Sequence, residues 1–255
     1  MFGLFRSRTP RPAAAAHLDV THDGSVYRVA LKRVATAQRF TLRVRAATRD
    51  VVLTIPARGS VAAAHEFAAR HAAWIGARLA RLPQPVSLEP GSRLPLRGIE
   101  HEIVHRPRQR GTVWVEAGDG GAPRLCVSGD GAHVERRIRD YLKRQAKQDF
   151  VAAVARHTAT LGLPTRPIGL RDTTSRWGSC SASGSLNFCW RLIMAPPFVL
   201  DYLAAHEVAH LVHLDHSPKF WAVAQRLSPD VERAEAWLKT HGSSLHRFAA
   251  RPAKA

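Results

Sequence analysis

The sequence predicts an α+β protein, with a β-rich N-terminal half that contains one helix and a second half built from helices and a β-hairpin. Residues 17–56 alternate apolar and polar side chains, which is typical of strands with one buried face. Residues 134–161 repeat apolar side chains at helical spacing, and residues 199–214 contain an apolar stripe with no Gly or Pro. Short apolar runs on both sides of Ser183-Gly184 indicate a hairpin.

The length of 255 residues suits one large or two small domains. We predict four segments along the chain. Residues 1–16 are expected to be a disordered tail. Residues 17–130 are expected to form a β-rich module, residues 131–245 a second domain, and residues 246–255 a loose C-terminal tail.

In the N-terminal half, strands are predicted by alternation and one helix by its capping residue. The predicted strands cover 26–31, 40–44, 51–55, 99–105, 113–116 and 124–127, separated by Asp-Gly and Gly-rich turn signals. Ser60 is expected to cap a single helix that continues to about Leu82, where Pro83 ends it. This half shows no catalytic constellation.

In the second half, a long helix precedes a hairpin and three shorter helices. Helices are predicted over 134–161, from Pro196-Pro197 through 214, over 218–227 and over 231–238, and β segments over 168–171, 175–180 and 186–192. The helix after Pro197 therefore contains His206, His210 and His213.

The composition is that of a globular protein with a strong positive charge. Hydrophobic residues make up 45%, and no apolar run approaches the length of a membrane span. Three cysteines, an odd number, argue against a disulfide framework and favour a reducing compartment, so we expect a cytoplasmic protein. The net charge of +18 is compatible with contact to a nucleic acid or another polyanion, and a solvated Arg-rich surface with a general attraction to anions is the more common explanation. The densest basic face lies on the predicted helix 134–161 and carries Arg136, Arg137, Arg139, Lys143, Arg144 and Lys147.

The stretch His206-Glu207-Val208-Ala209-His210 has the spacing of a metal site. On a helix, residues four apart lie one above the other, roughly 6 Å along the axis. Both imidazoles can then reach one ion, with Glu207 beside them as a carboxylate base. A mononuclear zinc hydrolase needs these groups and an open coordination position. Two ordinary histidines on an amphipathic helix are the alternative.

A second match to the same pattern serves as a control. His101-Glu102-Ile103-Val104-His105 alternates and runs into Arg106-Pro107, which predicts a strand. In a strand, four residues span about 13 Å. His101 and His105 are therefore not expected to share one ion.

A third protein ligand is required, because two imidazoles do not complete a site. His213 lies about 10 Å along the predicted helix from His206, too far to share an ion with both histidines. His216 stands just before Ser217-Pro218, where the chain must turn and can return toward the ion. We expect His216 to be the third ligand, with Asp215 or a remote carboxylate as the alternative.

Further motifs accompany these histidines. They are Ser175-Arg176-Trp177-Gly178-Ser179-Cys180, Leu192 through Ala195-Pro196, Asp201-Tyr202, and His216-Ser217 followed by Phe220-Trp221. With this combination the chain resembles the YgjP-like metallopeptidase family, which is related to SprT-type zinc proteases, from about Val26 to Leu238. The resemblance implies a zincin-like fold for the second half, a zinc ion at His206, His210 and His216, and a catalytic Glu207.

The function we expect is that of a zinc-dependent metallopeptidase, in which Glu207 takes a proton from a zinc-activated water that attacks a peptide carbonyl. Arg176 and Arg191 are candidates for stabilising the oxyanion. The hairpin around Trp177 can offer an edge strand to an extended peptide, although core packing is the more common role of a tryptophan. Cys180 has no task in such a mechanism and is expected to be a buried thiol.

Two other functions are compatible with the same residues. A zinc hydrolase can act on a nucleotide phosphoanhydride, and the positive charge favours such a substrate, but a Gly-rich phosphate loop and a second carboxylate cluster are missing from the sequence. A basic nucleic-acid-binding protein with structural zinc is the other alternative, supported by the charge and by the basic face over 136–147.

Overall fold

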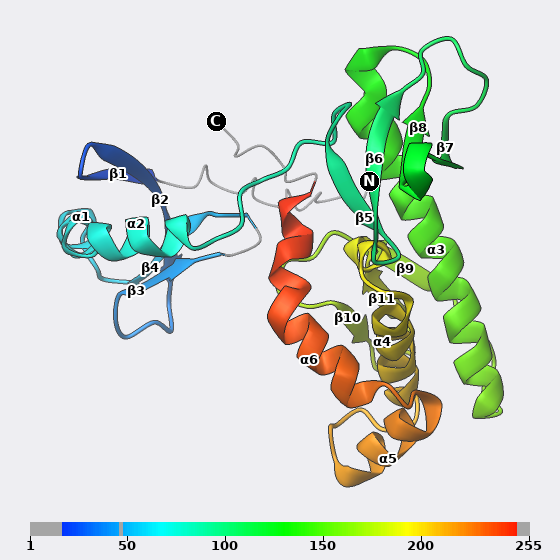
Figure 1. The fold of residues 1–255 in the computed structure, drawn as a ribbon. Helices are drawn as coiled ribbons and strands as arrows, with labels where there is room; N and C mark the ends of the chain where they lie inside the picture. The colour runs from blue at the N-terminus through cyan, green and yellow to red at the C-terminus, as the bar shows by residue number, and fades with distance from the viewer. Residues whose placement is uncertain (1–16, 46–47, 249–255) are drawn as a thin grey trace, which may run out of the picture. The chain divides into compact units, whose positions relative to one another are not determined.

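The computed structural model describes residues 17–45 and 48–248 (Figure 1). It is an α+β structure, as predicted, with three small mixed sheets and six α-helices in those residues. The chain divides into two compact units, Met1–Pro83 and Gln84–Ala255. The tail predicted over 1–16 lies outside the described residues.

The first unit is a four-stranded sheet packed against two helices. Its strands, in the order β1-β2-β4-β3, are β1 (His17–His22), β2 (Ser25–Val34), β4 (Val51–Pro56) and β3 (Thr41–Val44). Only β2 and β4 run parallel. The period of two along β4 places Val51, Leu53 and Ile55 on one face, where they share a core with Ala68 and Ile75 of the helices.

The single helix predicted over 60–82 is in fact two helices, α1 (Val61–Arg70) and α2 (Ala72–Ala80). They meet at His71, whose backbone leaves the helical region at φ −104° and ψ 10°. Its Nδ1 lies 2.7 Å from the carbonyl oxygen of Phe67, and the two rings stack. Neither Gly nor Pro marks this point, so the sequence contained no local signal for the break.

The second unit begins with a sheet that covers one end of a long helix. The strands, in the order β5-β6-β8-β7, are β5 (Arg93–Leu96), β6 (Ile99–His105), β8 (Pro123–Val127) and β7 (Val113–Ala117), with 3-10 turns η1 (Asp119–Gly121) and η2 (Gly131–His133). Leu94, Ile103 and Leu125 share a buried core with Ile138 and Leu142 of α3 (Val134–Thr160). The predicted domain boundary at residue 130 therefore falls inside this unit, because the apolar face of the sheet needs α3 to cover it.

The third sheet has the order β10-β11-β9 and contains the predicted hairpin. Its strands are β9 (Ile168–Arg171), β10 (Gly178–Cys180) and β11 (Leu186–Cys189), with β10 and β11 antiparallel. The strand expected to reach residue 192 ends at Cys189. The next five residues form the 3-10 helix η3 (Trp190–Met194), and all five are buried.

Around α4 (Pro197–Ala209) the second unit packs α3, α5 (Pro218–Leu227) and α6 (Val231–His241), as Figure 1 shows. Most side chains of α4 are buried, so this helix is apolar on nearly all sides. Within residues 17–45 and 48–248, no helix combines the length with the apolar character that a bilayer crossing requires.

The C-terminal tail predicted over 246–255 is wrong for its first residues. The 3-10 helix η4 (Gly242–Arg247) continues α6, and His246 and Phe248 are 5% and 7% exposed. The carbonyl of Arg247 accepts a hydrogen bond from Val86 N at 2.8 Å. Residues 246–248 are held by this pairing and by burial of His246 and Phe248, neither of which shows as a pattern in so short a stretch. Residues 249–255 lie outside the description.

Candidate metal centre

The helix that carries His206 ends directly before His210, so the two histidines lie at its C-terminal end. His206 lies in the last turn of α4, and His210 is its C-cap. The helix predicted through residue 214 is therefore too long, and His213 is not on it. His210 Nδ1 lies 3.0 Å from the carbonyl oxygen of His213, so the ring of His210 holds the turn that leads the chain away from the helix.

The turn returns His216 to the two helical histidines. Nε2 of His216 lies 3.2 Å from Nε2 of His206, and one nitrogen from each of His206, His210 and His216 lies within 4.8 Å of the others. Asp215, the alternative ligand, is used in the turn, because its Oδ1 accepts a hydrogen bond from Ser217 N at 3.3 Å. Ser217 then caps α5. The geometry favours His216 as the third member of the group.

The three imidazoles fit a divalent metal ion in position, and the surroundings of His206 and His210 also keep those two rings neutral. Burial, together with the charges of His210 and His216, lowers the pKa of His206 to about 4. Burial also lowers the pKa of His210. A metal binds the neutral imidazole, so an environment that disfavours protonation prepares these rings as ligands.

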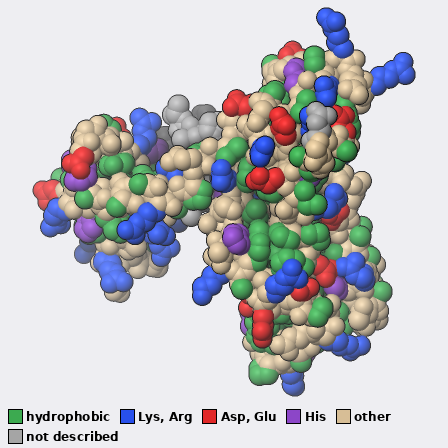
Figure 2. All heavy atoms as spheres, in the orientation of Figure 1, with side chains coloured by type: hydrophobic (Ala, Val, Ile, Leu, Met, Phe, Trp, Pro, Cys, Tyr) green, Lys and Arg blue, Asp and Glu red, His purple; other side chains and the backbone are tan. Residues whose placement is uncertain are grey.

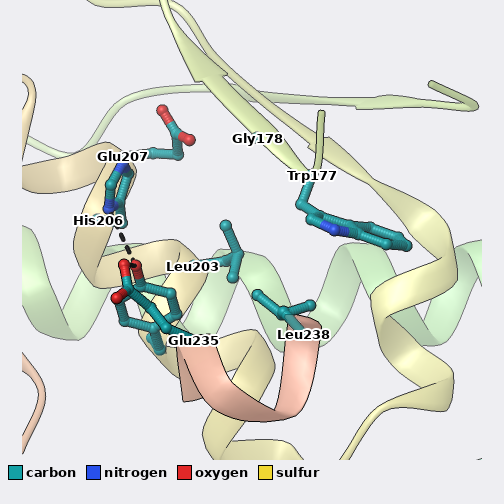
Figure 3. A pocket seen from close by; sticks show the side chains of 8 residues that line it. Trp177, Gly178, Leu203, His206, Glu207, Glu235 and Leu238 are labelled. Carbon is teal, nitrogen blue, oxygen red and sulfur yellow. Dashed lines mark hydrogen bonds between the residues drawn. The ribbon is translucent and has the colours of Figure 1, made fainter. Parts of the chain in front are cut away.

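Two residues from different helices orient the ring of His206. The hydroxyl of Tyr202, one turn earlier on α4, lies 3.4 Å from His206 Nδ1 and donates to Glu235 Oε1 at 2.8 Å (Figure 3). Tyr202 thus accepts the Nδ1 proton and leaves Nε2 for a metal. Such hydrogen bonds fix the tautomer and direction of metal-binding histidines in other proteins.

Glu207 is buried beside the histidines against a glycine of the hairpin. Its side chain is directed toward the strand that carries Gly178 (Figure 3), and a Cβ on Gly178 would stand 2.3 Å from Glu207 Oε1. A glycine is required here because any larger side chain would displace the carboxylate. Burial raises the pKa of Glu207 to about 7, and the charge of Arg176 opposes that rise.

A pocket of about 390 Å³ opens next to this group (Figure 3). It is lined by Trp177 and Gly178 of the hairpin, Tyr202, Leu203, His206 and Glu207 of α4, and Glu235 and Leu238 of α6. The lining is mostly apolar, its charged side chains are carboxylates, and none is Lys or Arg.

The three predicted substrate residues have different surroundings. Trp177 lines the pocket and stacks on His246 at 4.9 Å between ring centroids. Arg176 is exposed and close enough to influence the pKa of Glu207. Arg191 is only 4% exposed and pairs with Asp172, its Nε lying 3.0 Å from Oδ1.

Arg191 also donates to the carbonyl oxygen of Phe248 and lies over the Trp190 ring. These contacts hold Phe248 in place and leave the guanidinium buried, which makes Arg191 a poor candidate for the oxyanion. Cys180, expected to be a buried thiol, is half-buried, and burial raises its pKa. Because a raised pKa disfavours the thiolate, the thiol is not activated as a nucleophile.

The second His-Glu-x-x-His stretch forms strand β6, as predicted. His101 Nδ1 lies 2.7 Å from the carbonyl oxygen of Ile99, and His105 Nε2 lies 2.6 Å from that of Gly129. In the described part of the chain, His206, His210 and His216 are the one group of His, Cys, Asp or Glu side chains with metal-site geometry.

Sequence reasoning missed Tyr202, Glu235 and Gly178 as residues that support the site. Tyr202 precedes His206 by four residues and so shares its helix face, which is a signal that was present in the sequence. Gly178 stood in the matched Trp-Gly-Ser-Cys motif, but its contact with Glu207 needed the fold. Glu235 comes from α6 and has no local signal.

Comparison with known proteins identifies the family. The model of the YgjP-like metallopeptidase domain matches residues 38–241, which is most of the chain and includes the three histidines and Glu207. The curated proteins and the solved structures returned no match. On the family match, this chain belongs to the YgjP-like metallopeptidases.

Proposed function

We propose that the protein is a zinc-dependent metallopeptidase in which Glu207 is the general base. One observation carries the proposal: three imidazole nitrogens within 4.8 Å of one another, with a buried carboxylate from the same helix beside them. The family match supports a metal-dependent peptidase and leaves the metal open. A set of three nitrogen ligands favours zinc over magnesium or calcium, which prefer oxygen.

Zinc held by His206, His210 and His216 would supply Lewis-acid activation of a water and of the substrate carbonyl. Glu207 accepts the proton of the attacking water and delivers it to the leaving amine. A carboxyl whose pKa lies near 7 exchanges a proton readily at neutral pH, and burial raises the pKa of Glu207 to that value. Gly178 keeps the space that lets this carboxylate occupy its position.

The hairpin provides a place for an extended peptide. β10 pairs with β11 on one side and is an edge strand of its sheet, so its other edge offers backbone groups to a substrate strand. Gly178 of β10 and Glu207 line the same pocket. Trp177, Leu203 and Leu238 give that pocket an apolar surface suited to a side chain of the substrate. Arg176 is the candidate for binding the substrate carbonyl.

The pocket lining argues against a nucleotide phosphoanhydride as substrate. A triphosphate next to the histidines would face Glu207 and Glu235, and the lining holds no Lys or Arg; Arg176, near Glu207, is a single positive charge against the several negative charges of a triphosphate. An extended peptide carries no such charge and fits the apolar lining. We therefore favour the peptide.

The protein is proposed to act in the cytoplasm. Cys126, Cys180 and Cys189 are free thiols, and this fits a reducing compartment.

The test compares two substrate classes on one zinc-loaded protein. A library of internally quenched peptides is expected to be cleaved by the wild type, and nucleoside triphosphates are not. The Glu207→Gln variant should bind zinc normally and lose cleavage. Release of phosphate or pyrophosphate with no peptide cleavage would overturn the proposal and identify the protein as a hydrolase of nucleotide phosphoanhydrides.

A further inference from the structure

We propose that the first unit binds single-stranded nucleic acid in a hollow beside Trp74, well apart in sequence from the metal centre. The hollow has a volume of about 520 Å³. It is lined by Leu42, Arg43 and Val44 of β3 and by Trp74, Arg78 and Arg81 of α2 and its C-cap, and we call it the Trp74 hollow.

The hollow is built from one face of a helix and the edge of a sheet. Trp74, Arg78 and Arg81 follow the i, i+4, i+7 spacing, so they line one side of α2 over about 10 Å. Arg43 comes from β3, which pairs only with β4 and ends the sheet. Trp74 is 46% exposed, a large fraction for a tryptophan with no aromatic partner among the described residues. An indole presented in this way has a free ring surface.

The arginines of the hollow are uncommitted, whereas others in the same unit are used to hold the fold. Arg33 donates to three carbonyls at the end of β4 and in the turn after it, and Arg49 donates to two carbonyls at the end of the unit. For Arg43, Arg78 and Arg81, the described residues supply neither an ion pair nor a hydrogen bond. Three guanidinium groups around one hollow, without an acidic partner, are a site for an anion.

The net charge of the whole first unit also favours an anionic ligand. Residues 17–83 carry eleven Lys and Arg against four Asp and Glu, a net charge of +7. Figure 2 shows Lys and Arg side chains over the visible face of the unit on which α2 and β3 lie. Such a field attracts polyanions over a distance of about a Debye length, roughly 8–10 Å at physiological salt.

An exposed tryptophan among arginines selects one kind of polyanion. Phosphates pair with guanidinium groups, and an unpaired base stacks on an aromatic ring or on Arg itself. Base-paired DNA keeps its bases stacked inside the duplex, and the Asp and Glu side chains of an acidic peptide carry no ring to place on the indole. The pairing of Trp74 with Arg43, Arg78 and Arg81 therefore fits single-stranded nucleic acid best.

The basic face of α3, the densest basic surface in the sequence, is less available for such contacts. Arg137 donates to the carbonyl of Ser128, Arg139 pairs with Glu135, and Lys147 donates to the carbonyl of Ile168. Arg144 lies over the Tyr141 ring, so four of the six basic residues on that face make contacts within the chain. These contacts are made within α3, to β9 and to the loop at Ser128, which leaves the Trp74 hollow as the stronger candidate.

The proposal is tested by the binding of fluorescein-labelled oligodeoxythymidine of 15 nucleotides to the full chain, measured by fluorescence anisotropy. The triple variant Arg43→Gln, Arg78→Gln, Arg81→Gln is expected to bind at least about tenfold more weakly, and its salt slope should fall by about 2, because each lost phosphate contact lowers it by about 0.7. The matched control removes the same charge from α3, as Arg136→Gln, Lys143→Gln, Arg144→Gln. It should change the affinity by about twofold or less, and equal losses in the two triple variants would overturn the hollow as the site.

Stacking is tested separately at Trp74. Trp74→Ala should weaken oligonucleotide binding by about tenfold, and Trp74→Phe should retain most of the affinity. Because Trp74 is half exposed, both variants are expected to melt near the wild-type temperature. An unchanged affinity of Trp74→Ala, tighter binding of the matching duplex, or equal competition by polyglutamate would overturn single-stranded nucleic acid as the ligand. Glu207→Gln should bind the oligonucleotide normally, so this test and that of the peptidase fail independently.

Discussion

The pattern His-Glu-x-x-His occurs twice in this chain, once on β6 and once at the end of α4. On β6, His101 and His105 each direct a ring nitrogen to a different backbone carbonyl, that of Ile99 and that of Gly129. On α4, one turn of helix separates His206 from His210, and both rings meet His216.

The two stretches share their spacing, so the difference between them must come from secondary structure and from the residues that follow. Four residues span about 13 Å along a strand but about 6 Å along a helix. Even the helical pair needs a third ligand, and the chain after the helix must turn back to bring that ligand to the two histidines. Here the turn is held by the His210 ring on the carbonyl of His213 and by Asp215 on Ser217 N. Secondary structure and the following turn together make the site.

The largest difference between the two stretches is expected at their glutamates. Glu207→Gln should lower kcat/KM for a cleaved peptide by about 10³-fold, since a general base contributes about 10²–10⁴-fold. Its zinc content should stay at the wild-type level. Glu102→Gln, on the exposed side of β6, is the matched control and should stay within about twofold. A Glu207→Gln protein with more than a tenth of the wild-type rate would remove the general-base role.

The next largest effect is expected on metal affinity. His216→Ala should weaken zinc binding by about 100-fold or more, because two imidazoles do not complete a site. His105→Ala should leave it unchanged. Competition with a chromophoric chelator measures both. Tight zinc binding by His216→Ala would show that another group, Asp215 first, supplies the third ligand.

His246 allows the effect of burial on a histidine pKa to be measured apart from metal binding. His246 is buried like His206 but lies outside the ligand group, and burial lowers its pKa from 6.5 to about 4, with the charge of Arg191 acting in the same direction. The unfolded chain therefore binds a proton at higher pH than the folded chain. The stability that this neutral ring provides is complete above about pH 6.5 and is lost as the pH falls toward about 4.

His246→Phe keeps an aromatic ring on Trp177 and removes the titration. Between pH 7.5 and 4.5, the free energy of unfolding of the metal-free wild type should fall by about 2 kcal/mol more than that of the variant. Urea unfolding with a chelator present measures this difference. Both proteins contain the other histidines, so the difference between their two pH profiles reports on His246. Zinc affinity at pH 7.5 should be the same in the two, and parallel pH profiles would show that His246 is protonated in the folded chain.

The smallest effect is expected from the residues that orient His206. Tyr202→Phe should weaken zinc binding by about tenfold, because the ring loses the acceptor that fixes its tautomer. Glu235→Gln should act in the same direction. Tyr141→Phe, on α3 away from the ligand group, is the control and should bind zinc as the wild type does. Equal affinities for Tyr202→Phe and wild type would show that the helix alone orients His206.

Much of the fold was predictable because periodicity records which face of an element is buried. The alternation of β4, the helical repeat of α3 and the hairpin at Ser183-Gly184 were all read from the sequence. The errors fell where no local residue marks an end. Examples are the break at His71, the end of α4 at Ala209, and the burial of His246 and Phe248.

The sequence by itself determined the chemistry of the candidate site. It determined two histidines one helical turn apart, a glutamate between them, a third histidine before a forced turn, and the motifs of the family. Spacing within a single element survives folding, because the geometry of a helix or a strand is set locally by backbone sterics and hydrogen bonds.

Only the tertiary structure decided which groups surround that chemistry. Gly178 against Glu207, Glu235 behind Tyr202, and Arg191 committed to Asp172 are contacts between elements far apart along the chain. So is the convergence of β3 and α2 around Trp74. These contacts depend on how apolar faces pack against one another, and packing is a property of the whole unit that no single stretch of sequence records.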